Sequence, residues 1–110
     1  MKKALQPKMW TPRGPYSLGT QLGNLAFLAG QIAQDNDGKT IAAGDVKAQT
    51  TVVIDKIEQI LAEAGMGLAD VMSTTVYLQS LADYAAMNEV YGRAFQAEGA
   101  EPSSISVVLA

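Results

Sequence analysis

The chain contains neither cysteine nor histidine, and these two absences limit its chemistry. Without cysteine it has no disulfide, thiolate nucleophile or zinc–cysteine site, which fits a reducing compartment. Without histidine it has no histidine triad, imidazole metal ligand or imidazole acid–base group. Any reaction must therefore use carboxylates, lysine, arginine, tyrosine, hydroxyls, backbone groups or bound water.

Basic clusters and long apolar runs are also missing. The net charge is −3, and the chain has no cluster of basic residues beyond Lys2-Lys3. This weighs against a surface that follows nucleic acid phosphates. No apolar run reaches the roughly 18 residues that a membrane span needs. The basic start, Met1 to Pro7, leads into no apolar signal core, so we expect a cytoplasmic protein without a membrane partner.

The clearest pattern present is a long amphipathic helix followed by a strand, within Gly44 to Leu78. Asp45 is suited to cap the N-terminus of this helix, and Gly65 to end it in the left-handed conformation. Val71 to Leu78 is rich in β-branched residues and predicts the strand. The residues of the inward helix face recur at three- and four-residue steps: Val46, Thr50, Val53, Ile54, Ile57, Ile60, Leu61 and Ala64.

The rest of the chain predicts further short elements around this unit. Pro7 and Pro12 discourage helix, so we expect residues 1–13 to form an extended lead-in. We then expect strands at Tyr16 to Thr20 and Leu25 to Ile32, a turn between them at Gln21 to Asn24, a polar loop at Gln34 to Lys39, a second helix at about Asp83 to Phe95 and a last strand at Ser103 to Ala110.

These elements predict one α+β domain over residues 1–110, a two-layer sandwich with a mixed sheet and two helices packed on one face. The strand at Leu25 to Ile32 is apolar on both faces, and the outer face of Val71 to Leu78 carries Tyr77. An apolar outer surface of this kind must be covered, and the two helices cover only the other face of the sheet. We therefore expect a homo-oligomer. A trimer is consistent with this pattern, although the periodicity does not give the number of subunits.

Several short blocks resemble the RidA/YjgF family, also known as endoribonuclease L-PSP-like, in the family's order and over nearly the whole chain. They are Gly14-Pro15-Tyr16-Ser17, Ala29-Gly30-Gln31-Ile32, Gly44-Asp45-Val46 with Ala48-Gln49-Thr50, Leu61-Ala62-Glu63-Ala64-Gly65, Thr74-Thr75-Val76-Tyr77-Leu78 and Met87-Asn88-Glu89-Val90-Tyr91. The resemblance implies a chorismate-mutase-like fold and a homotrimer whose clefts between subunits bind a small metabolite. Many members hydrolyse enamine or imine intermediates to keto acids and ammonia, and they need no metal or cofactor.

The chain departs from the family at the residues that carry this activity. Ser104 stands where the family has an arginine that grips the substrate carboxylate, and losing such a charged hydrogen bond costs about 1.5–3 kcal/mol. Ser106 stands where cysteine is frequent, and Ala29 where the family has serine. The last strand, which carries the family's water-positioning glutamate, is not in this sequence. The resemblance thus leaves open whether the chain is an enzyme.

The remaining candidate binding residues each have a functional and a structural interpretation. Tyr16 resembles the family's pocket tyrosine, but it also suits a hydrophobic plug after a Gly-Pro turn. Gly30 would let a ligand approach the backbone, or it marks a bulge. For Asn88, in an apolar helical stripe, we favour a structural hydrogen bond over ligand contact. Arg13 could replace the missing anion clamp, although a solvated loop arginine is the commoner case.

Three functions follow from these residues. The first is a RidA-like protein that binds a small metabolite between subunits and retains some enamine or imine hydrolysis. The second is a non-catalytic binding or regulatory module on the same scaffold. Ser104 in the arginine position favours this function. The third is an RNA-directed role, and the acidic charge and lack of histidine place it last.

Overall fold

The computed structural model describes the backbone of residues 1–97, 102 and 104–109, and the side chains of this set except those of 97 and 104–109. Its strands are β1 (Lys3–Leu5), β2 (Gly19–Leu22), β3 (Leu25–Leu28), β4 (Ser73–Leu78) and β5 (Ser104–Leu109). Its helices are α1 (Val46–Ala62) and α2 (Tyr84–Ala97), with single 3-10 turns at Leu68–Asp70 and Leu81–Asp83. The predicted α+β class is confirmed.

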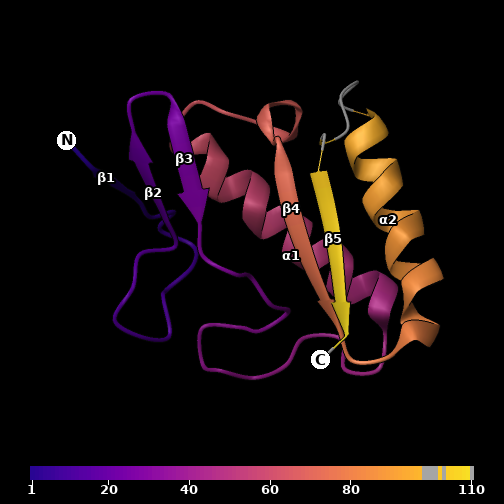
Figure 1. The fold of residues 1–110 in the computed structure, drawn as a ribbon. Helices are drawn as coiled ribbons and strands as arrows, with labels where there is room; N and C mark the ends of the chain where they lie inside the picture. Colours follow the sequence, from indigo (N-terminus) through magenta and orange to yellow (C-terminus); the bar gives the residue numbers. More distant parts are fainter. Residues whose placement is uncertain (98–101, 103, 110) are drawn as a thin grey trace.

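The strands form two hydrogen-bonded groups among the described residues. β1, β2 and β3 pair antiparallel in that order, and β4 pairs parallel with β5. Figure 1 shows α1 passing behind β4 and β5, with α2 running alongside them. The parallel pair is possible because the chain returns from β4 to β5 through α2, as parallel strands need a long crossover.

The ends of α1 form as the sequence predicts. The Oδ1 atom of Asp45 accepts a hydrogen bond from the Ala48 amide at 3.0 Å, which caps the first turn. At the other end Gly65 has a φ of +70°. The amides of Gly65 and Met66 donate to the carbonyls of Ala62 and Leu61, both at 3.0 Å, which is the Schellman pattern. The helix therefore begins and ends at sequence-encoded positions.

Several predicted strand boundaries were wrong. The lead-in contains β1, because Lys3 to Leu5 pair with Gly19 to Gln21 far along the chain. β2 begins at Gly19 and continues through Leu22, since Gly23 (φ +60°) and Asn24 alone make the hairpin turn. β3 stops at Leu28. β4 starts only at Ser73, because the Val71 amide closes the preceding 3-10 turn onto Leu68 at 3.1 Å.

Two buried apolar clusters fill the space between the strands and the helices. One contains Ile54 and Leu61 of α1, Leu68 and Phe95. The other contains Ile60 of α1 with Leu5 and Leu18. α1 contributes to both, so the inward face predicted from its periodicity joins the N-terminal strands to α2.

The opposite face of the strands remains open in the single chain. Leu25 and Phe27 of β3 are 54% and 70% exposed, and Tyr77 of β4 is 69% exposed. The other face of β4 points inward, with Leu78 only 8% exposed. The chain alone therefore leaves uncovered the apolar surface for which the sequence predicts cover.

Candidate functional site

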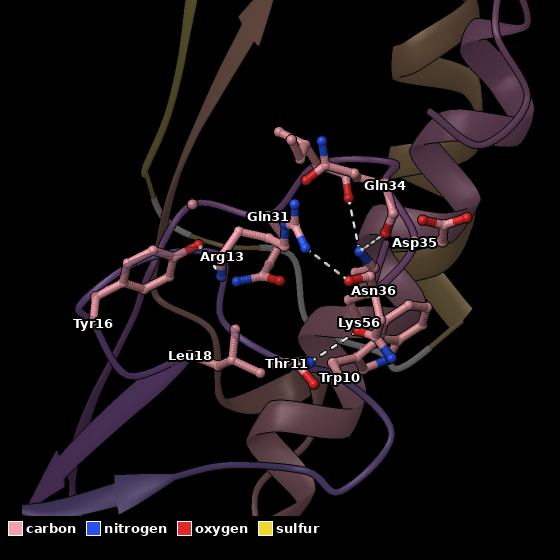
Figure 2. Close-up of a pocket in the computed structure, with 12 residues that line it drawn as sticks. Trp10, Thr11, Arg13, Tyr16, Leu18, Gln31, Gln34, Asp35, Asn36 and Lys56 are labelled. Atoms are coloured by element: carbon pink, nitrogen blue, oxygen red, sulfur yellow. Dashed lines mark hydrogen bonds between the residues drawn. The ribbon is translucent and has the colours of Figure 1, made fainter. Parts of the chain in front are cut away.

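A small cavity of about 110 Å³ lies where the N-terminal segment meets the loop after β3. Residues 10–18 form one side of it, and a wall segment, residues 30–36, forms the other (Figure 2). Lys56 of α1 completes the lining. Loops that are ordered by a rigid scaffold commonly carry binding residues, so this cavity is the candidate site.

Arg13 is fixed in this site by hydrogen bonds. Its Nη1 donates to the carbonyl of Asn36 at 2.9 Å, and its amide lies 3.4 Å from the hydroxyl of Tyr16. The guanidinium also lies against Gly38, because a Cβ added at Gly38 would lie 2.7 Å from Nη2. Arg13 is exposed, but it is bound to the loop that follows β3 and does not extend freely into solvent.

Tyr16 follows a tight turn in which its amide donates to the carbonyl of Gly14 at 2.8 Å. The residue is 47% exposed in the single chain. Gly30 also lines the cavity, and no atom would lie within 4 Å of a Cβ added there. The ring of Tyr16 and the open space at Gly30 leave room for a ligand beside Arg13.

The wall segment is tied to the N-terminal segment through Asn36. Its Oδ1 accepts from the Thr11 amide, and its Nδ2 donates to the Met9 carbonyl, both at 2.9 Å. Next to it, Oδ1 of Asp35 accepts from the amides of Asp37 and Lys39, also at 2.9 Å each. The polar loop predicted from the sequence is thus a defined structure.

Lys56 is the buried charged group of the site. Only 6% of the residue is exposed, and its Nζ donates to the carbonyls of Ile32 at 3.0 Å and Gln34 at 2.5 Å. The same ammonium lies 4.1 Å from the ring centre of Trp10, a cation–π contact. Burial lowers the pKa of Lys56 below its ordinary value, and the negative charge of Asp35 partly opposes that shift.

The predicted site residues are only partly brought together. Arg13, Tyr16 and Gly30 line the cavity. Ala29 directly precedes Gly30, and its amide donates a hydrogen bond to the Leu18 carbonyl at 2.9 Å. Asn88 lies on α2, is exposed in the single chain and does not line the cavity. Ser104 and Ser106 lie on β5, opposite Ser73 and Thr75 of β4, and their side chains are outside the described residues.

Sequence reasoning missed Lys56, Trp10 and Asn36. A signal for Lys56 was present, because it comes three residues after Val53 and four before Ile60 on the apolar face of α1. A charge at such a position must find partners when the helix packs. Asn36 gave no comparable signal, since its partners are backbone groups about 25 residues away.

The cavity combines a cation, an aromatic ring and amide groups, a set suited to a small polar anion. Within the described part of the chain, no cluster of three or more His, Cys, Asp or Glu side chains could hold a metal ion. Neither described helix has both the length and the apolar character needed to cross a bilayer.

The fold belongs to the chorismate-mutase-like α+β class, as solved structures of the same shape show. One is Escherichia coli TdcF with bound serine, with a TM-score of 0.88 and 30% identity over 98% of this chain and 85% of that one. The chain belongs to the RidA/YjgF family: the family model described as Endoribonuclease L-PSP matches residues 6–110.

Relatives of known name support the same assignment. A RutC family protein of Pyrococcus abyssi is 51% identical over 84 residues, which are 76% of this chain and 66% of that protein. The 3-aminoacrylate deaminase RutC of Acinetobacter baylyi is 36% identical over 87 residues, 79% of this chain and 69% of the relative. The chain thus matches about two thirds of the length of these curated relatives.

Proposed function

We propose that this RidA-like protein binds a small carboxylate-bearing metabolite in clefts between the subunits of a homotrimer and hydrolyses enamine or imine acids. The observation that carries the proposal is the placement of Arg13 beside Tyr16 in a cavity that Gly30 also lines. The name of the Acinetobacter relative, a deaminase of an enamine acid, supports the reaction class. The serine bound to TdcF supports a small amino-acid-like ligand.

The reaction needs little from the protein. The enamine gains a proton at carbon and loses one from nitrogen to become an imine. Water adds to the imine carbon, and the carbon–nitrogen bond of the adduct then breaks as a hydroxyl proton passes to the departing ammonia, which leaves the keto acid. Arg13 would bind the carboxylate in place of the arginine that Ser104 replaces, because a guanidinium suits a planar anion. Tyr16 would form the wall of the site and orient the attacking water through its hydroxyl.

The exposed side of the cavity supports its location between subunits. Ile32 lines the cavity and is 62% exposed, and the open faces of β3 and β4 also carry exposed apolar side chains. A second copy that packs on these surfaces would bury them and close the site. Sedimentation of the purified protein gives the number of subunits, and a monomer at all concentrations contradicts this part of the proposal.

The test is keto acid release from 2-aminoacrylate formed in situ, compared with buffer and with serum albumin. The parent should accelerate release, and Arg13→Gln should reduce kcat/KM on the order of ten- to a hundredfold, the value of a charged hydrogen bond. Arg93→Gln removes the chain's other arginine, on the exposed end of α2, and should leave the rate unchanged. No acceleration by the parent contradicts the proposal.

Ser104 favours a second candidate, a non-catalytic metabolite-binding module. In that case the parent shows no turnover, Ser104→Arg restores it, and small carboxylates raise the melting temperature of the parent. A flat melting temperature across a panel of keto and amino acids contradicts this candidate.

A further inference from the structure

The buried ammonium of Lys56 attaches the cavity wall to α1. The carbonyls of Ile32 and Gln34 both belong to the wall segment, and both accept from Nζ of Lys56 on α1. A lysine that makes two such bonds while 6% exposed is committed to them, since an ammonium without partners would not remain buried. Lys56 therefore links two parts of the chain that are about 22 residues apart.

Trp10 fixes the other side of this ammonium. Its ring packs against Nζ at 4.1 Å, and its indole N–H donates to Oε1 of Gln59 at 2.5 Å. Gln59 lies on α1 three residues after Lys56, so the helix holds both the lysine and the ring above it. The N-terminal segment and the wall segment thus meet at one point of α1.

The position of Arg13 depends on the same wall. Its guanidinium donates to the carbonyl of Asn36, two residues after Gln34. The side chain of Asn36 in turn holds the backbone of Thr11 and Met9. A shift of the wall away from α1 would therefore move the cation that the proposed function places on the substrate carboxylate.

We propose that Lys56 is a positioning residue: its ammonium holds the wall segment against α1 and so sets the place of Arg13 in the cavity. This inference rests on the proposed function for its effect on turnover, but its structural part stands alone. Removing the ammonium alone leaves the two carbonyls without their donor, so it costs some stability. The effect particular to Lys56 is on geometry, and a displacement of about 1 Å can cost a hundredfold in rate.

Two substitutions and one control test the proposal. Lys56→Met keeps the apolar stem and removes the donor, whereas Lys56→Arg keeps a cation that can donate to both carbonyls. Ile54→Ala destabilises the same helix at a buried position that faces Phe95 and does not line the cavity. Hydrogen–deuterium exchange of a peptide that covers residues 30–39 is measured for all three, followed by kinetics with 2-aminoacrylate.

Lys56→Met should raise amide exchange across the wall segment at least about tenfold, and raise KM more than it lowers kcat, while it lowers the melting temperature less than Ile54→Ala does. Lys56→Arg should restore both properties. Ile54→Ala should lower the melting temperature without selective exchange at the wall. Unchanged exchange in Lys56→Met, or equal exchange in Ile54→Ala, overturns the inference. A parent without turnover contradicts the proposed function and leaves the exchange result to decide on Lys56.

Discussion

Where α1 meets α2, the chain is held by buried apolar side chains: Ile54, Leu61 and Phe95 are each no more than 6% exposed. Around the cavity polar contacts are added to the apolar ones, and Asn36, Arg13 and Lys56 each bond backbone groups of a distant segment. The hydrophobic effect is non-directional, whereas hydrogen bonds fix atoms at set distances. The helix pair therefore supplies stability, and the cavity region supplies geometry.

Phe95→Ala tests whether the helix pair supplies the stability, and it should have the largest effect of the substitutions considered. Phe95 is 1% exposed, and its ring centre lies 4.5 Å from that of Tyr91. Its removal should cost about 3–5 kcal/mol of unfolding free energy, a large part of the total for a small domain. Urea denaturation measures the loss, and Phe95→Leu should lose less. A cost below about 1 kcal/mol contradicts a core centred on this ring.

Two glycines allow a second comparison, between a tightly packed core position and an open position at the cavity. A Cβ at Gly19 would lie 2.8 Å from Cγ2 of Ile60 and 3.3 Å from Cβ of Leu5, so Gly19→Ala should cost about 1–3 kcal/mol by overpacking. A Cβ at Gly30 meets nothing within 4 Å.

Gly30→Ala should therefore leave the melting temperature nearly unchanged while it narrows the cavity and weakens turnover. Thermal denaturation and the enamine assay separate the two effects. Equal destabilisation by the two substitutions would show that the wall at Gly30 is packed as tightly as the core.

The smallest effect should come from the exposed ion pairs of the helix surfaces. Glu89 lies 2.6 Å from Lys47 and 3.0 Å from Arg93, and the hydrogen bond and charge of Lys47 hold the pKa of Glu89 below its ordinary value. A carboxylate whose pKa is lowered by folding stabilises the fold at pH values above its unfolded pKa. This stabilisation is lost as the pH falls through its pKa in the folded state.

Glu89→Gln should thus lower the melting temperature slightly at neutral pH. The difference from the parent should vanish in acid and in about 1 M salt, where charges are screened within roughly 3 Å. Melting curves at several pH values measure it. A difference that persists in acid would point to a role other than ion pairing.

The fold was predictable where local signals act alone. The period of α1, the cap at Asp45 and the left-handed Gly65 are all encoded within a few residues of where they act. β1 was not predictable, because Lys3 to Leu5 become a strand only by pairing with β2. The hairpin register was also ambiguous, since the turn could consist of Gly23 and Asn24 alone or of all four residues from Gln21 to Asn24.

The candidate site was predictable only for residues inside a familiar motif. Arg13, Tyr16 and Gly30 lie in or next to such blocks, and the structure places them in one cavity. Lys56, Trp10 and Asn36 act through backbone carbonyls and amides of distant segments, and no local pattern encodes such partners. Their roles arise only when these distant segments meet in the folded chain.

The place of Trp10 has a consequence for spectroscopy. It is the chain's single tryptophan, and it lies beside Lys56 at the cavity and not between the helices. Indole emission therefore reports on the cavity region, whereas far-ultraviolet circular dichroism is dominated by α1 and α2. Coincident melts by the two signals would mean that the two regions unfold as one cooperative unit, and separate melts would give each region its own free energy of opening.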